Sequence, residues 1–323
     1  MDKVKVSLCL ITFNQPDSVA CFLESISAYK YGSIEVLIRD DSTNDETFDT
    51  VDSYKSSCSV PIHYFRGKKS SSGGYDNALL FLTERAQGEY IWWYGDDVLV
   101  EDAISRVLSV LDGPQKFALV WINARNIDDS SDRGLDLGGD KIFEAPGAIF
   151  ETNVGLLGFP SATIIRRDLI SEKIKEAQKF IGTTLTGFYL VMSAITTPGA
   201  KSIYIQEPCL LSKPKPTGEV RWYDSFQVHG INYARISLDF RNAIDRKSYR
   251  KGIAEHFGRI WRAVLYERAL GLETGFASRT PKLIKMAKLY WGYPEFYVAF
   301  FLMLLPRPVL GGLFKAFRKL RNR

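Results

Sequence analysis

Short apolar segments alternate with segments of helical spacing at the start of the chain, and this alternation constrains the fold most. The apolar segments, which we expect to be strands, cover residues 4–12, 34–38, 61–65 and 89–94. Between them lie helix-like stretches at residues 18–29, 46–56 and 76–86. Strands that alternate with helices predict an α/β fold with a mostly parallel sheet flanked by helices. A chain of 323 residues has room for this domain and a substantial appendage.

Polar clusters follow three of these strands, at TFNQ (12–15), RDDSTND (39–45) and GDD (95–97). In a parallel α/β sheet, ligands bind beyond the carboxyl ends of the strands. A carboxylate there can accept the ring N–H of uracil or thymine, or the hydroxyls of a ribose. We therefore expect Asp40 and Asp41 to contribute to a binding site at these strand ends, with Ser42, Thr43 and Asn44 as further hydrogen-bonding side chains. The alternative for the two aspartates alone is an Asx-rich turn before the next helix.

Asp96 and Asp97 end the apolar run YIWWYGDD. Adjacent carboxylates repel, so a protein that keeps them together supplies a cation, a proton or full solvation. Mg²⁺ is typically held by one or two carboxylates plus substrate phosphates, and Mn²⁺ suits similar ligands. We predict that both aspartates are metal ligands and catalytic, since such an ion stabilises a leaving diphosphate. The alternative role for the two aspartates is to cap a helix that starts near Glu101. Trp92 and Trp93, which precede them on the same strand, are expected in the core.

The loop GKKSSSGG (67–74) suggests close backbone approach to a ligand before a helix begins. Gly73 and Gly74 would allow that approach, and Asp76 could cap the helix that starts there. Lys68 and Lys69 could meet phosphates or simply lie in solvent. The loop lacks the P-loop pattern, and no GxGxxG follows the first strand, so both of those nucleotide-binding classes are excluded.

The net charge of +5 is concentrated at the C-terminal end. From Phe296 onward there are six basic residues and no acidic one, which leaves 42 − 6 = 36 basic against 37 acidic residues elsewhere. A nucleic-acid partner is not expected, because a nucleic-acid-binding domain should carry a basic face, and the basic excess here is confined to the C-terminal segment. The four cysteines lack zinc or disulfide spacing and suit a reducing cytosol. The N-terminus lacks the apolar region of a signal peptide.

The C-terminal segment predicts contact with a membrane surface. The apolar run at residues 296–305 is shorter than the ~20 residues of a membrane-spanning helix. LFKAFRKLR (313–321) interleaves apolar and basic residues, as helices in a membrane interface do. The alternative is a helix packed on the protein with its charges in water. The Pro-rich break KPKPTG (213–218) predicts one domain at residues 1–215 and a helical region at residues 216–323.

The segments VSLCLITFNQPDSVACFLESI, VLIRDDSTND and GGYDNALLFLTERAQGEYIWWYGDD, in this order, resemble family 2 glycosyltransferases of the GT-A (Rossmann-like) type. WWYGDD, FPSATIIRR and FIGT are most similar to the abequosyltransferase-like subgroup of bacterial O-antigen synthesis. The resemblance implies a nucleotide-sugar donor and a saccharide acceptor on a polyprenyl diphosphate. It also implies an enzyme on the cytoplasmic face of the inner membrane. It assigns the nucleotide to Thr12, Asn14, Asp40, Asp41, Ser42, Gly73, Gly74 and Asn77, and Mg²⁺ or Mn²⁺ to Asp96 and Asp97.

Two departures from the family pattern leave alternatives open. The DxDD motif is contracted to YGDD, and the region FIGTTLTGFYLVMSAI (180–195) lacks the acidic base of inverting members. A product that keeps the donor's α configuration would account for the missing base. Asp168 and Glu207 are the remaining acids considered, each with a structural or surface alternative. Trp222 and Tyr223 could contact the acceptor or pack in the core.

The rival functions differ in class. One is a non-catalytic nucleotide-sugar-binding or membrane-adaptor protein with a degenerate metal motif. Another is a nucleotidyltransferase, which should carry a Gly-rich loop with Arg or Lys directly after the first strand. TFNQPDS is not such a loop. The glycosyltransferase interpretation is therefore preferred.

Overall fold

The computed structural model describes residues 3–27, 29, 33–67, 74–95, 97–129, 131–212, 226–270 and 280–312. The chain forms two compact units. The first comprises residues 1–149 with 156–214, and the second comprises residues 150–155 with 215–323. The predicted domain boundary after residue 215 lies outside the described residues, as do Trp222 and Tyr223, and it stays a prediction.

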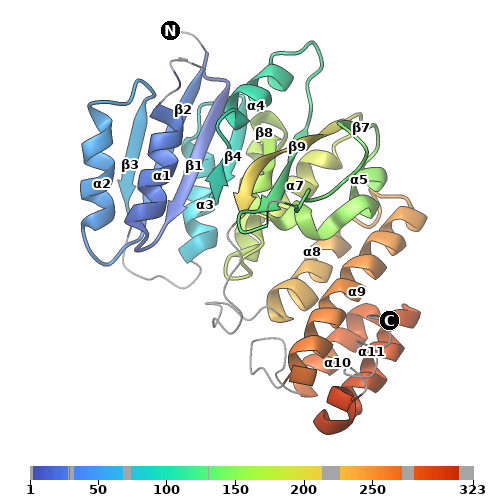
Figure 1. Cartoon of the computed structure of the whole chain (residues 1–323). Helices are drawn as coiled ribbons and strands as arrows, with labels where there is room; N and C mark the ends of the chain where they lie inside the picture. Colours follow the sequence, from blue (N-terminus) through green and yellow to red (C-terminus); the bar gives the residue numbers. More distant parts are fainter. Residues whose placement is uncertain are drawn as a thin grey trace. The chain divides into compact units, whose positions relative to one another are not determined.

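Within the described residues, the first unit is built on a nine-stranded sheet in the order β3-β2-β1-β4-β8-β6-β9-β5, with β7 beside β9 (Figure 1). Strands β5, β7 and β8 run against the other six. The predicted mostly parallel α/β sheet is therefore confirmed. The strands are β1 Val6–Thr12, β2 Ile34–Asp40, β3 Ile62–Arg66, β4 Tyr90–Tyr94, β5 Val98–Leu99, β6 Leu119–Asn126, β7 Lys141–Phe143, β8 Thr163–Arg166 and β9 Ser202–Ser212.

Strand β4 lies in the centre of this unit and is buried along its whole length. A strand that is covered on both faces has apolar residues at consecutive positions. This is why apolar and polar residues do not alternate within YIWWY. Trp92 donates its indole N–H to the carbonyl of Ser161 at 2.8 Å, and Trp93 donates to the hydroxyl of Thr83 at 3.0 Å. Both rings are fully buried, so their predicted place in the core is confirmed.

Helices cover both faces of the sheet. In the sheet, β2 lies beside β1, and β3 lies beyond β2 on the same side. Strand β4 lies on the opposite side of β1, so the connection from β3 to β4 crosses back over β2 and β1. Right-handed crossovers therefore place α1 and α2 on one face and α3 on the other, as Figure 1 shows. The helices of the first part of the chain are α1 Pro16–Ser27, α2 Glu46–Lys55, α3 Gly74–Arg85, α4 Ala103–Leu111, α5 Pro146–Asn153, α6 Ile174–Ala177 and α7 Thr186–Ile195.

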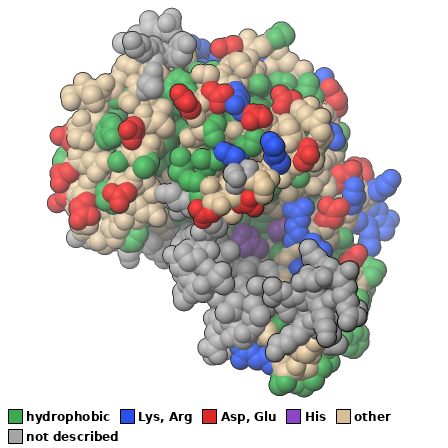
Figure 2. Space-filling view, in the orientation of Figure 1, with side chains coloured by type: hydrophobic (Ala, Val, Ile, Leu, Met, Phe, Trp, Pro, Cys, Tyr) green, Lys and Arg blue, Asp and Glu red, His purple; other side chains and the backbone are tan. Residues whose placement is uncertain are grey.

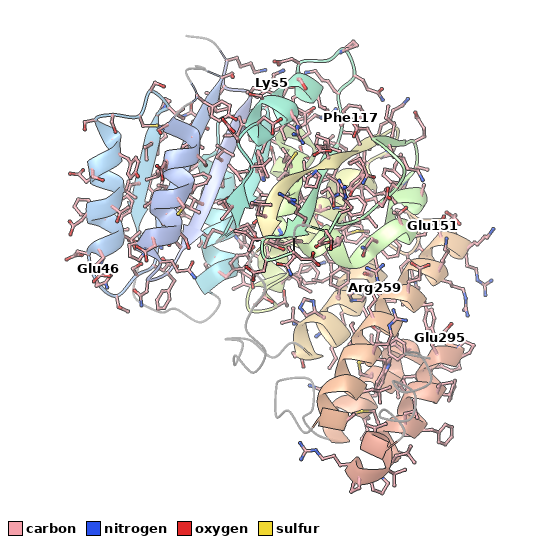
Figure 3. All side chains as sticks on the ribbon, in the orientation of Figure 1. Lys5, Glu46, Phe117, Glu151, Arg259 and Glu295 are labelled. Carbon is pink, nitrogen blue, oxygen red and sulfur yellow. The ribbon has the colours of Figure 1, made fainter. Side chains whose placement is uncertain are left out.

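The second unit is helical, as predicted. Its core contains aromatic rings, with the Phe257 ring centroid 4.4 Å from that of Tyr290 and 6.1 Å from that of Phe296. Arg259, labelled in Figure 3, donates to the side-chain oxygen of Asn153 within this unit. Among the described residues, no helix has the length and apolar character needed to cross a membrane. The helices are α8 Tyr233–Asp239, α9 Arg246–Leu270, α10 Thr280–Tyr290 and α11 Pro294–Leu304, preceded by a π-helical segment at Phe226–Asn232.

Candidate functional site

The carboxyl ends of three neighbouring strands bring most of the predicted binding residues together. Thr12 pairs with Asp40 in the β1–β2 register, and Asp40 pairs with Arg66 in the β2–β3 register. Leu10 of β1 pairs with Tyr94 of β4, so the chain leaves β4 toward Asp97 at the same edge. The expected convergence of strand ends is therefore present.

Asp40 is fully buried at this edge and anchors the loop that follows it. Its Oδ1 accepts the backbone N–H of Ser42 at 2.8 Å, and its Oδ2 accepts the Tyr64 hydroxyl at 2.6 Å. The Arg66 guanidinium lies 3.6 Å from the same oxygen. Burial and the hydrogen bond to Asp40 raise the pKa of Tyr64 to about 12. The carboxylate thus binds protein groups in this structure, and its contact with a nucleotide stays a prediction.

Asn14 connects the end of β1 to the loop after β2. Its backbone adopts a left-handed conformation with φ of 51°, which is uncommon for a non-glycine residue. Its N–H donates to Ser42 Oγ at 2.7 Å, and its side-chain oxygen accepts the N–H of Thr43 at 2.9 Å. The Thr12 hydroxyl beside this loop is buried and has no hydrogen-bond partner in the described part of the chain. A buried hydroxyl of this kind is suited to a ligand, because leaving it unpaired is unfavourable.

Asp41 lies between two glycines. A Cβ on Gly67 would lie 1.5 Å from Asp41 Oδ1, and a Cβ on Gly74 would lie 4.0 Å from its Oδ2. The Arg39 guanidinium donates to Oδ1 at 2.9 Å and holds the carboxylate in place. Gly67 was not predicted as a site residue, although it is the first glycine of the segment GKKSSSGG. Gly73, Lys68 and Lys69 lie outside the described residues.

Asp97 lies in the short connection between β4 and β5, while Asp96 lies outside the described residues. The backbone carbonyl of Asp97 accepts the hydroxyl of Tyr94. Helix α4 starts only at Ala103, with Asp102 at its N-cap, so the alternative that Asp97 caps this helix is wrong.

The charge of Asp97 acts on Tyr75, which lies in the first turn of α3. Burial raises the pKa of Tyr75, and the charges of Asp76 and Asp97 raise it further. No group of three or more His, Cys, Asp or Glu side chains suited to a metal is found within the described ranges. Mg²⁺ needs only one or two carboxylates when phosphates supply its other ligands. A carboxylate at the sheet edge, with Asp96 adjacent in the chain, fits such an ion.

Asp76 does not cap its own helix as predicted. Its Oδ2 accepts the backbone N–H groups of Gly182 at 2.8 Å and Thr184 at 2.9 Å, and its Oδ1 accepts that of Thr186 at 3.2 Å. Burial raises the pKa of Asp76, and these donors oppose the rise. The carboxylate therefore caps α7 and the turn before it, because packing turns it away from α3. Asn77, on the same turn of α3, is exposed.

The two acids considered as possible bases are both exposed, and each lies beside an arginine. Asp168 is 70% exposed and pairs with Arg166, which stands opposite Tyr90 at the amino end of β4. It is therefore at the other edge of the sheet from Asp97. Glu207 is 71% exposed and lies 3.9 Å from Arg106 on α4. Both match the surface alternative.

Known proteins with similar sequences and structures support the resemblance. Abequosyltransferase RfbV of Salmonella typhimurium is 24% identical over 263 residues, covering 73% of this chain and 72% of that protein. The crystal structure of S. aureus TarS 1–349 in complex with UDP-GlcNAc has a TM-score of 0.64 at 14% identity. That match covers 92% of this chain and 81% of the other. TarS 1–349 without the nucleotide sugar has a TM-score of 0.63 at 13% identity, covering 90% and 82% of the two chains.

At these identities the structural matches show the shared fold, and the predicted GT-A architecture is confirmed. The decisive match is the family model described as Glycosyl transferase family 2, which covers residues 7–172, just over half of the chain. The matched segment contains the ends of β1, β2 and β4 and the glycine loop. The protein therefore belongs to glycosyl transferase family 2.

Proposed function

We propose that this glycosyltransferase moves a sugar from a nucleotide-sugar donor to a saccharide acceptor. The observation that carries the proposal is the buried polar edge of the sheet. There the Thr12 hydroxyl, which is unpaired within the described residues, the Asp40 network and Asp97 lie at the ends of three neighbouring parallel strands. Ligands of such sheets bind beyond the carboxyl ends of the strands.

In this proposal the donor nucleotide lies against Thr12 and the loop at residues 40–43. The Asn14 and Ser42 hydrogen bonds hold that loop, so its conformation is formed before the donor arrives. Gly67 leaves room for the Asp41 carboxylate, because a Cβ there would lie 1.5 Å from Oδ1. The complex of TarS with UDP-GlcNAc supports a nucleotide-sugar ligand for this fold.

We assign Asp96 and Asp97 to a divalent ion, Mg²⁺ or Mn²⁺, on the donor diphosphate. When bound, such an ion neutralises the charge that grows on the departing nucleoside diphosphate. Tyr75, whose pKa is raised by burial and by the charges of Asp76 and Asp97, stays protonated. It therefore adds no charge to this part of the site.

The similarity to an abequosyltransferase supports a deoxyhexose as the transferred sugar and a role in O-antigen or related surface polysaccharide synthesis. Such an acceptor would be carried on a polyprenyl diphosphate. The basic C-terminal sequence supports a peripheral location on the cytoplasmic face of the membrane, where anionic lipids attract Lys and Arg.

Isothermal titration calorimetry tests the donor site. A panel of nucleoside diphosphates and nucleotide-sugars would be titrated into the wild type and Asp97→Asn, with and without Mn²⁺. We expect metal-dependent binding of one nucleotide, weakened on the order of a hundredfold in Asp97→Asn, since a buried or partly buried carboxylate ligand is lost. Asp168→Asn is the matched control, because its carboxylate is at the opposite edge of the sheet.

The outcomes separate the candidate functions. Equal binding by Asp97→Asn and wild type would contradict the metal assignment. Donor binding without hydrolysis or transfer, given a panel of saccharide acceptors, would support the non-catalytic alternative. No nucleotide binding under any metal condition would overturn the proposed function.

A further inference from the structure

Helix α11 is apolar on all sides, yet only one side packs against its own unit. Its sequence, PEFYVAFFLML, has Glu295 as its single charged residue, at the first turn (labelled in Figure 3). Phe296, Ala299 and Met303 are buried against the bundle. A helix that is apolar all round is normally covered all round, by protein or by lipid.

The other side of α11 exposes large apolar side chains. Tyr297 is 47% exposed, Val298 62%, Phe301 65% and Leu304 58%. Their spacing of three, four and seven residues places them on one face of the helix. We call this set the α11 stripe. Hydrophobic side chains are visible at the outer margin of the helical unit in Figure 2.

We propose that the α11 stripe is a lipid-binding surface that inserts into the interface of an anionic membrane. This inference rests on the proposed function, because it names the element that brings the enzyme to a lipid-linked acceptor. With 11 residues the helix is too short to span a bilayer, so it lies along the surface. The inserting element is then a folded helix face and not the basic tail alone.

The basic residues on α10 and in the sequence after α11 favour lipid over a second copy of the chain. Lys285 and Lys288 of α10 and Arg307 after α11 are all exposed. From Phe296 to the end of the sequence there are six basic residues and no acidic one. A twofold dimer through the stripe would bring Arg307, three residues after Leu304, toward the same residue of the second copy, which is unfavourable. An anionic membrane suits both the apolar stripe and the basic residues that follow it in the sequence.

Exposed aromatic residues add a second signal. Trp291, just before α11, is 68% exposed, and Tyr297 carries its hydroxyl on the stripe itself. Tyr297 donates that hydroxyl to the carbonyl of Trp291 at 2.8 Å, so the two residues are connected. Trp and Tyr are enriched at the level of lipid headgroups, where one side of the ring is apolar and the other is wet.

Vesicle cosedimentation of the full chain tests the inference. The probes are vesicles of phosphatidylcholine, alone and mixed with anionic phosphatidylglycerol. We expect binding to the mixed vesicles, and a loss on the order of tenfold in the double variant Phe301→Gln/Leu304→Gln, since two inserting side chains become polar. The matched control is Ile142→Gln/Leu238→Gln, which changes two exposed apolar residues outside the stripe. Hydrogen exchange over residues 297–304 should slow on vesicles in the wild type only.

Failure of the lipid-binding surface can be told apart from failure of the proposed function. Nucleotide calorimetry on the same variants measures donor binding independently of vesicle binding. Unchanged vesicle binding by the stripe variant, with donor binding intact, would overturn the lipid-binding surface. A concentration-dependent dimer that is lost in the stripe variant, without vesicle binding, would assign the surface to a second copy. A further variant lacking residues 313–323 should lose the salt-sensitive part of binding while keeping vesicle-induced protection of α11.

Discussion

The carboxylate of Asp76 accepts the backbone N–H of Thr184, 108 residues away in the chain, at 2.9 Å. Thr184 adopts a left-handed conformation with φ of 62°, and Gly182 beside it has φ of 87°. A threonine in that region is strained by about 1–3 kcal/mol, so it needs support from its surroundings. Asp76 supplies this support and thereby connects the start of α3, beside the glycine loop, to the start of α7.

Asp76→Ala should destabilise the protein by about 2–4 kcal/mol, because the backbone donors at residues 182–186 lose their acceptor. Asp76→Asn keeps one acceptor oxygen and should cost less. Urea denaturation followed by circular dichroism measures both. Asp49→Ala is the control, since Asp49 is an exposed aspartate in the first turn of α2 and its loss should stay within about 0.5 kcal/mol. An equal effect of the two alanine variants would refute the capping role.

Gly67→Ala should disturb the donor site more than the fold. The new Cβ would lie 1.5 Å from Asp41 Oδ1 and 2.8 Å from Arg39 Nε, so the Arg39–Asp41 pair must move. We expect nucleotide affinity to fall on the order of tenfold while stability falls by about 1–2 kcal/mol. Gly258→Ala is the control: a Cβ there meets nothing within 4 Å, and the α9 helix should gain up to about 1 kcal/mol. Unaltered nucleotide affinity in Gly67→Ala would separate Asp41 from the donor site.

Tyr64→Phe should destabilise the protein by about 1–3 kcal/mol, because the fully buried Asp40 loses a hydroxyl donor. Tyr54→Phe, at a half-buried tyrosine of α2 outside this network, should have a much smaller effect. Thermal unfolding of the two variants side by side gives the comparison. A Tyr64→Phe protein as stable as wild type would mean that Arg66 satisfies Oδ2 of Asp40 without the Tyr64 hydroxyl.

His256 should make stability depend on pH. Burial lowers the pKa of this histidine to about 4, and its Nε2–H donates to the carbonyl of His229 at 2.9 Å. That hydrogen bond opposes the fall in pKa, whereas the charges of His229 and Arg259 add to it. In the unfolded chain a histidine has a pKa of about 6.5, so unfolding takes up a proton between these two values. The free energy of unfolding therefore falls as pH falls through this window, by about 2 kcal/mol from pH 7 to pH 5.

His256→Gln removes the titrating group and keeps an N–H donor for the His229 carbonyl. Its free energy of unfolding should fall less than that of wild type between pH 7 and pH 5, by the same amount of about 2 kcal/mol. His63→Gln is the control, because His63 is a half-exposed histidine of the sheet unit. Parallel pH profiles for wild type and His256→Gln would contradict a buried neutral imidazole.

Much of the fold could be predicted because the signals are local. Apolar runs and helical spacing identify strands such as β1 and β4 from a few residues. The convergence of Thr12, Asp40 and Asp97 at one sheet edge then follows, since parallel strands end on the same side. The nucleotide and metal roles of these residues stay predictions, to be tested as described above.

The sequence by itself therefore determined the strand and helix order, the family and the edge at which polar residues gather, because these depend on periodicity and on motifs read along the chain. Only the tertiary structure decided which atoms meet. The antiparallel β8 inserts between β4 and β6, Gly67 makes room for Asp41, and Asp76 turns from its own helix to α7. The tertiary structure also leaves one apolar side of α11 exposed. Side-chain direction and long-range partners depend on packing between distant segments, and no local pattern contains that information.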